Sequence, residues 1–145
     1  KEYLKEIQRV LRPGGKAYIT TPNRSHSLSR NPWHIREYLP HELETLAAGI
    51  FSGVEMKGVA GNNKVMEYHE LNRKSVQRIT RFDILDLQHR LPSFVLRLPY
   101  ELLNRINRNK LETTDDALVR SITHKDYLVV DDATQALDLF LIATK

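Results

Sequence analysis

Apolar residues in the first sixty positions predict two helices and two strands. A helix over 1–11 has one apolar side, formed by Leu4, Ile7, Val10 and Leu11. Pro13-Gly14-Gly15 ends it, and the β-favouring residues of 16–21 predict a short strand. A second helix is predicted over 40–49 and a second strand over 51–59. They follow a long polar loop at 24–38, and long loops in compact domains often carry function.

The middle of the chain has the spacing of long helices. Residues 65–90 place apolar side chains along one side of a helix. Pro92 begins a second helical stretch, which Pro99 is expected to kink or interrupt. The apolar stripe of this second stretch consists of Phe94, Val95, Leu98, Leu102, Leu103 and Ile106.

The end of the chain returns to an extended pattern. Residues 112–125 are polar and poorly patterned, and 127–130 form a short apolar run. The nearly continuous apolar run 137–143 predicts a strand buried on both faces. Strands that alternate with helices in this way favour an α/β fold, with a helical insert over 65–125.

Positive charge is concentrated in the insert. The chain has 22 Lys+Arg and 18 Asp+Glu, a formal net charge of +4. Residues 72–110 hold nine basic and three acidic residues, so this block carries +6 and the remainder −2. The block is either an ordinary solvated surface or an element that binds an anionic partner. Its apolar stripe either packs on the sheet, covers an amphiphilic substrate, or rests on a membrane surface. Few aromatic residues accompany the basic ones, so a stacking platform for nucleic acid is not predicted.

Composition narrows the class of protein. The 145 residues include no cysteine, which excludes disulfides, thiolate nucleophiles and cysteine-based zinc sites. The histidines show no metal-ligand spacing, so no metal site is predicted. No run reaches the ~20 apolar residues of a membrane-spanning helix. A cytoplasmic protein is expected, which the absence of cysteine fits.

Residues 4–15, 31–43 and 137–145 together resemble one family, the class I, type 11-like S-adenosylmethionine-dependent methyltransferases. Residues 4–15, with the sequence L-K-E-I-Q-R-V-L-R-P-G-G, resemble the helix and turn that precede the family's fifth strand, and 16–21 matches that strand. Residues 31–43, N-P-W-H-I-R-E-Y-L-P-H-E-L, are similar to the family's H-x-R-x-[FY]-x-P-x-E-L stretch. Residues 137–145 resemble its closing strand.

The resemblance covers 1–60 and about 126–145, and it implies that 1–145 is the C-terminal half of a Rossmann-like methyltransferase domain. The insert over 65–125 would then be a substrate cap. In the family, a G-x-G-x-G turn and an acidic residue hold the cofactor S-adenosylmethionine. Nothing in this sequence matches that turn, so no cofactor-binding residue is identified. We therefore expect the chain alone to be inactive and not to bind the cofactor tightly.

The same resemblance implies a sheet in which the three predicted strands take the family's order 5-7-6, with the last strand antiparallel. The first of them, Lys16–Thr21, would lack its usual neighbour in the sheet. An unpaired strand edge is a template for association. We therefore expect self-association through Lys16–Thr21.

The resemblance also places the long loop on the substrate side of the cofactor pocket. His34 is the candidate catalytic base, because histidine exchanges a proton near neutral pH. Arg36 would hold a carboxylate or phosphate, and Trp33 would stack on a planar substrate. Asn23 and Tyr38 complete the candidate substrate-binding set. The structural alternatives are anchoring of the loop for His34, Arg36 and Trp33, a turn for Asn23, and packing for Tyr38.

Three functions stay open on the sequence. The first is the substrate-side half of a methyltransferase that acts on a small-molecule or glycan/lipid-type acceptor. The second is a non-catalytic module whose basic insert binds anions or a membrane surface. The third is a regulatory or degenerate partner of an active methyltransferase. A glycine-rich turn encoded in frame upstream of Lys1 would favour the first, and an upstream stop codon the third.

Overall fold

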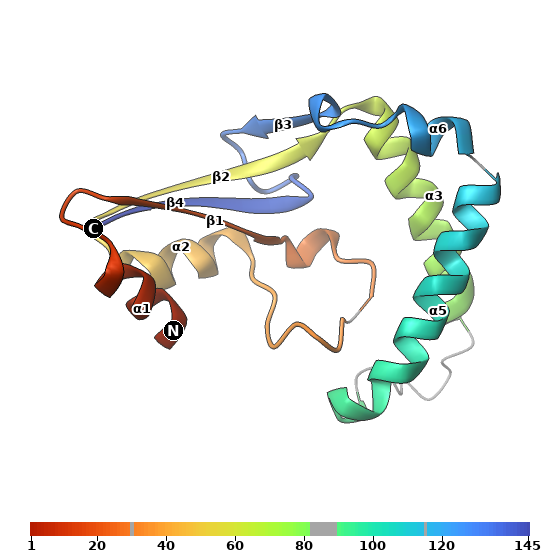
Figure 1. Ribbon diagram of the computed structural model, residues 1–145, viewed down its shortest axis with the longest axis horizontal. Coiled ribbons are helices and arrows are strands. Elements are labelled where there is room, and N and C mark those ends of the chain that lie inside the picture. Colours follow the sequence, from red (N-terminus) through yellow and green to blue (C-terminus); the bar gives the residue numbers. More distant parts are fainter. Residues whose placement is uncertain (30, 82–89, 115) are drawn as a thin grey trace. The chain divides into compact units, whose positions relative to one another are not determined.

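The protein has a mixed α/β fold with one four-stranded sheet (Figure 1). A computed structural model describes residues 1–29, 31–81, 90–114 and 116–145.

The chain forms two compact units. We call the first the sheet unit; it consists of Lys1–Ser27, Glu37–Ala60 and Leu128–Lys145. The second, the helical unit, consists of Leu28–Arg36 and Gly61–Tyr127. The helical unit therefore contains the predicted insert together with part of the long loop.

The sheet has the strand order β1-β4-β2-β3. Its elements and the two helices beside it are α1 (Glu2–Val10), β1 (Lys16–Pro22), α2 (Pro40–Ala48), β2 (Gly53–Gly61), β3 (Tyr127–Val130) and β4 (Asp138–Thr144). β4 pairs antiparallel with both β1 and β2. The three predicted strands thus take the predicted order, with the last one antiparallel. β3 is a fourth strand that was not predicted, because its four residues are too few to show an alternating pattern.

The core of the sheet unit lies on one face of β4. Leu139, Leu141 and Ala143 are fully buried on this face and pack against residues of α1 and α2. Both helices lie on the same side of the sheet (Figure 1). The opposite face of β4 is only half-buried, and there Phe140 stacks on Tyr18 with ring centroids 6.1 Å apart. The prediction that this strand is buried on both faces is therefore wrong, because its helices cover one face.

Glycines fix two close approaches in the sheet unit. Gly14 has φ +71°, and its N–H donates to the carbonyl of Lys145 at 3.1 Å, which ties the turn after α1 to the end of β4. At Gly58 of β2, a Cβ atom would lie 2.2 Å from Cβ of Ala136. Glycine at position 58, although unfavourable within a strand, therefore lets the turn before β4 pack on β2.

The helical unit is built from α3 (Asn63–Thr80), α5 (Ser93–Thr114) and α6 (Asp116–Ser121). α3 confirms the helix predicted over 65–90 as far as Thr80, and Arg81 forms a turn. Residues 82–89 lie outside the described residues. α5 continues through Pro99, so the predicted interruption is wrong, while a kink at Pro99 stays a prediction. α6 forms in a stretch without a clear sequence pattern. Within the described ranges, no helix is long and apolar enough to cross a membrane.

Candidate functional site

Asn23 follows β1 and is fully buried. Its Nδ2 donates to the carbonyls of Ala133 at 3.1 Å and Ala136 at 2.9 Å, and its Oδ1 accepts from the backbone N–H of Ser25 at 3.2 Å. The amide therefore fastens the turn before β4 to the end of β1. This arrangement fits the turn-forming alternative. Both the Nδ2 and the Oδ1 of Asn23 already bond to the protein, and these are the atoms that would bind a substrate.

Tyr38, at the end of the long loop, lies beside Asn23, which precedes the loop. The two residues form an isolated parallel bridge, and the backbone N–H of Arg24 donates to the Tyr38 carbonyl at 3.0 Å. The Tyr38 side chain packs against the core. Arg24 pairs with Glu42 of α2 at 3.2 Å. The loop thus leaves and re-enters the sheet unit at one place, beside the carboxyl end of β1.

Asp138, the first residue of β4, lies at this same end of the sheet. It stands opposite Pro22 of β1 and Val59 of β2 in the strand register. Alternation along β4 places its side chain on the face opposite Leu139. Burial raises the pKa of the Asp138 carboxyl. Within the described residues, this carboxyl has no hydrogen-bond or ion-pair partner. A half-buried acid without a partner is a candidate functional group, and Asp138 was not among the site residues predicted from the sequence.

Trp33 and His34 are held on a turn that Asn31 organises. The Oδ1 of Asn31 accepts from the backbone N–H of Trp33 at 3.0 Å, and its Nδ2 lies 3.3 Å from Nε2 of His34. The guanidinium carbon of Arg97, on α5, lies 4.2 Å from the centroid of the Trp33 ring. This distance is that of a cation–π contact, which attaches the loop to α5. Arg36 is exposed on the same segment.

The five predicted site residues fall into two groups. Asn23 and Tyr38 belong to the sheet unit and lie together, whereas Trp33, His34 and Arg36 belong to the helical unit. Within each group, the structure supports the anchoring role for the residues whose contacts are described. Substrate binding by these residues, and catalysis by His34, remain predictions.

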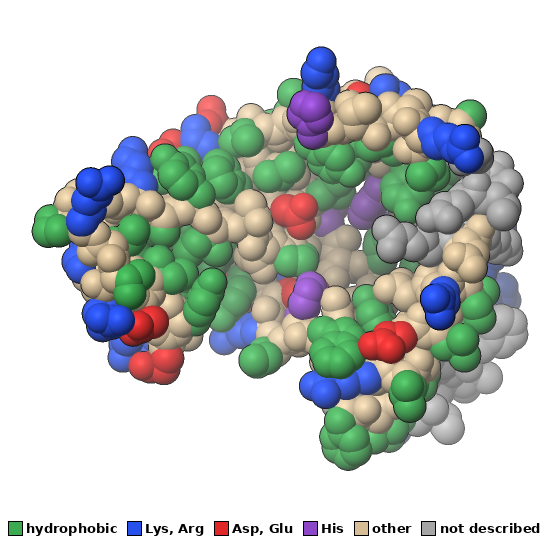
Figure 2. All heavy atoms as spheres, in the orientation of Figure 1, with side chains coloured by type: hydrophobic (Ala, Val, Ile, Leu, Met, Phe, Trp, Pro, Cys, Tyr) green, Lys and Arg blue, Asp and Glu red, His purple; other side chains and the backbone are tan. Residues whose placement is uncertain are grey.

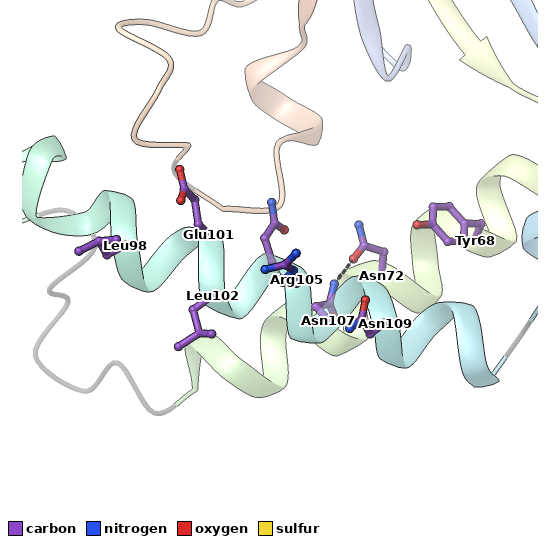
Figure 3. A pocket seen from close by; sticks show the side chains of 9 residues that line it. Tyr68, Asn72, Leu98, Glu101, Leu102, Arg105, Asn107 and Asn109 are labelled. Atoms are coloured by element: carbon purple, nitrogen blue, oxygen red, sulfur yellow. Dashed lines mark hydrogen bonds between the residues drawn. The ribbon is translucent and has the colours of Figure 1, made fainter.

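A cavity of about 790 Å³ lies along α3 and α5 of the helical unit (Figure 3). This volume is within the range of small-molecule sites. Two of its lining residues come from α3 and the rest from α5: Tyr68 and Asn72, then Leu98, Glu101, Leu102, Asn104, Arg105, Asn107 and Asn109. Four of the nine are asparagines, whose amides both donate and accept hydrogen bonds. Such a lining suits a polar ligand with several hydroxyl or amide groups.

Asn107 fixes the geometry of this cavity. It is 6% exposed, its Oδ1 accepts from the Ser75 hydroxyl, and its Nδ2 donates to Oδ1 of Asn72 at 2.8 Å (Figure 3). The network joins α5 to α3 through polar contacts. The cavity was not predicted from the sequence, although the sequence carries a signal for it: asparagine is a poor helix former, and three asparagines occur in 104–109.

Asp126 joins the segment before β3 to the start of α3 within the helical unit. Its carboxylate accepts from the backbone N–H of Thr123 at 2.8 Å, from Nζ of Lys64 at 3.0 Å and from Nδ2 of Asn62 at 2.7 Å. These donors hold the pKa of Asp126 well below its usual range, with the Thr123 N–H as the largest contribution. Asn62 also caps α3, since its Oδ1 accepts from the Lys64 N–H at 3.1 Å.

We expect Asp126→Asn to lower the melting temperature near neutral pH and to have little effect in strong acid. The folded-state pKa is depressed, so the carboxylate stabilises the fold above its unfolded pKa of about 3.9, and this contribution is lost as the pH falls below that value. Thermal melts across this pH range measure the difference. A difference between variant and wild type that is the same at every pH would contradict the assigned contacts.

The described residues do not form a metal site or a glycine-rich nucleotide cradle. Within the described ranges, no group of three or more His, Asp or Glu side chains is placed to hold a metal ion. Gly61 is the last residue of β2, shortly before α3, where a strand–turn–helix nucleotide site would need open space. A Cβ atom there would lie 2.3 Å from the Val65 side chain, so Val65 fills that space.

Comparison with known proteins gives no relative for this chain. No family model matches it, and neither a curated protein nor a solved structure does.

Proposed function

We propose that this chain is the acceptor-side part of a class I S-adenosylmethionine-dependent methyltransferase. The observation that carries the proposal is the strand order β1-β4-β2 with an antiparallel last strand, which the resemblance of 4–15 and 31–43 implied. The chain therefore would be a C-terminal portion of a Rossmann-like sheet, with the helical unit as a substrate cap. A cytoplasmic location belongs to the same proposal.

In this proposal, the cofactor S-adenosylmethionine binds to a part of the enzyme other than residues 1–145. Nucleotide-like cofactors need glycines that let backbone approach the ligand, and the space beside Gly61 is filled by Val65. The residues present do not fit this cofactor, and we derive no step through it. What this chain contributes in the proposal is the binding of the methyl acceptor and removal of its proton.

Asp138 and His34 are the candidate groups for taking up the acceptor proton. Asp138 lies at the carboxyl end of β1 and β2, the edge at which open α/β sheets bind ligands. Its raised pKa brings it closer to working pH, as a general base requires. The asparagine-lined cavity is a separate candidate for binding the acceptor; it lies within the helical unit and does not involve Asp138. Its amides favour an acceptor with several hydroxyl groups, such as a glycan.

Calorimetry with S-adenosylmethionine tests this proposal. Residues 1–145 should show no micromolar binding, whereas the polypeptide encoded by the whole reading frame should bind the cofactor and transfer its methyl group. Micromolar binding to residues 1–145 would overturn the assignment of this chain to the acceptor side. A whole polypeptide that does not bind the cofactor would overturn the family proposal itself.

We expect Asp138→Asn to leave stability at pH 7 unchanged or to raise it. Burial raises the folded-state pKa, so the carboxylate opposes folding above its unfolded pKa, and an uncharged amide removes that effect. Urea unfolding at pH 7 measures the change. Asp131→Asn is the control, because Asp131 is exposed and paired with Lys57 at 2.8 Å, so its loss should lower stability slightly. A large loss of stability in Asp138→Asn would contradict its unpartnered state.

Self-association through β1 remains a prediction. Among the described strands only β4 pairs with β1, so one edge of β1 is open, and Tyr18 on this strand is 64% exposed. Sedimentation velocity should show dimers or larger species that increase with concentration. Tyr18→Lys should shift the distribution to monomer, whereas Tyr3→Lys, which changes a 74% exposed tyrosine on α1, should not. A wild-type monomer at high concentration would count against this contact.

A further inference from the structure

α5 has an exposed apolar face. Phe94, Leu98, Leu102 and Ile106 follow one another at four-residue spacing, so each is turned by only about 40° from the last. They are 71%, 80%, 61% and 54% exposed. We call these four residues the α5 stripe. Singly exposed apolar residues are common, but a continuous row of four on one helix marks an interaction surface.

The α5 stripe is separate from the contact between α5 and α3. Asn107, which bonds to Asn72 and Ser75 of α3, is 6% exposed. Leu98 is nine residues from Asn107, about two and a half helical turns, and therefore lies on the opposite side of α5. The Asn107 side of α5 therefore carries the hydrogen bonds to α3, and Leu98 lies on the other side of the helix.

Cationic and aromatic side chains flank the α5 stripe. Arg97 and Arg105 are exposed and lie three residues from Phe94 and Leu102, while Glu101 is the acid between them. Arg97 also covers the ring of Trp33, which is 52% exposed. Figure 2 shows hydrophobic side chains next to Lys and Arg at the N-terminal end of α5, in the lower part of the view. The block 72–110 around this helix carries +6.

We propose that the α5 stripe, with Arg97, Arg105 and Trp33, docks the protein on an anionic lipid membrane surface. Helices that lie in the interface combine an apolar face with arginine or lysine beside it, and tryptophan prefers the same depth of the bilayer. The excess of positive charge selects lipid over an uncharged apolar partner, since each cation near an anionic surface adds to the attraction. This proposal is independent of methyl transfer.

Co-sedimentation with vesicles tests the docking surface. The protein should bind vesicles of phosphatidylcholine mixed with phosphatidylglycerol, bind vesicles of phosphatidylcholine alone much less, and dissociate as salt rises. Trp33 is the sole tryptophan, so its fluorescence should shift to the blue and resist acrylamide quenching on anionic vesicles. Equal binding to both vesicle types, or no change in Trp33 emission, would overturn the proposal.

Paired variants separate the apolar and charged contributions. Leu102→Asp should weaken vesicle binding about tenfold or more, because the variant no longer buries a leucine side chain in the membrane. Val10→Asp should leave vesicle binding unchanged. Val10 is the matched control, because it is 64% exposed on α1. Arg97→Gln with Arg105→Gln should weaken binding to anionic vesicles about tenfold, and Arg12→Gln should not.

Three results would assign the α5 stripe to another partner and overturn the membrane proposal. A large fall in the melting temperature of Leu102→Asp would place the stripe in a hydrophobic core. Lipid-free dimers that Leu102→Asp dissociates, without vesicle binding, would place it between two copies of the chain. Binding to single-stranded DNA that requires Arg97 and Arg105, again without vesicle binding, would make the surface a polyanion site.

Discussion

Asn23→Asp should lower the free energy of unfolding by about 3–5 kcal/mol at pH 7, the scale of an uncompensated buried charge. The substitution keeps the size of the side chain and the oxygen that accepts from Ser25. It removes the Nδ2 donor and sets a carboxylate against the carbonyl oxygens of Ala133 and Ala136, in a position with no solvent exposure. Urea unfolding of the wild type and variant at pH 7 measures the loss.

The pH dependence identifies the cause of this loss. Burial without a donor raises the pKa of a carboxyl, so an aspartic acid at position 23 favours its protonated form in the folded protein. The difference from wild type should therefore shrink as the pH falls toward about 4, because a protonated carboxyl donates a hydrogen bond again. Asn31→Asp is the matched control: Asn31 lies in the same loop, and an aspartate still accepts from the Trp33 N–H. If Asn23→Asp were as mild as this control, the Asn23 amide would be available to a substrate.

The sheet unit could be predicted from sequence because its signals are local. Proline and glycine after α1, Pro40 at the start of α2, and the apolar run of β4 each specify an element within a few neighbours along the chain. The strand order could not be predicted from these local signals. It was predicted from the family resemblance, and the pairing of β4 with β1 and β2 has the predicted order.

The candidate site could be predicted less well, because it depends on contacts between distant segments. Asp138 is half-buried only because Pro22 and Val59 lie on either side of it in the sheet. Asn107 is buried only because α5 packs on α3 through Ser75. Periodicity marks which residues share a face, but it does not identify the segment that covers that face.

The α5 stripe illustrates the same limit. Its helical spacing is plain in the sequence, where the alternatives were packing on the sheet, covering an amphiphilic substrate and resting on a membrane surface. The exposed fractions of Phe94 and Leu98 favour the two binding alternatives over packing. The cavity along α3 and α5 shares Leu98 and Leu102 with the stripe, so an acceptor bound there would sit beside any membrane that α5 contacts. The membrane proposal and the proposed function thus favour an amphiphilic acceptor.

Leu139→Ala should destabilise the protein by about 2–5 kcal/mol, as large-to-small substitutions in a packed core do. Leu139 is fully buried in the core that β4 forms with α1 and α2, and β4 is paired on both of its edges. Little space is available for neighbours to collapse into the cavity, because the surrounding residues belong to paired strands and packed helices. Urea unfolding gives the loss, with an unchanged dependence on denaturant as the check that the variant folds to the same extent.

Leu128→Ala is the control for this substitution, because Leu128 is 55% exposed on β3 and its truncation should cost less than about 0.5 kcal/mol. The comparison with Asp138 is sharper still. Side chains alternate along a strand, so Leu139 faces the core and Asp138 the opposite side. Adjacent positions should therefore respond with opposite signs at pH 7: Leu139→Ala lowers stability, and Asp138→Asn leaves it unchanged or raises it. Losses of similar size at both positions would contradict the register of β4, since a shift of one residue exchanges the two faces.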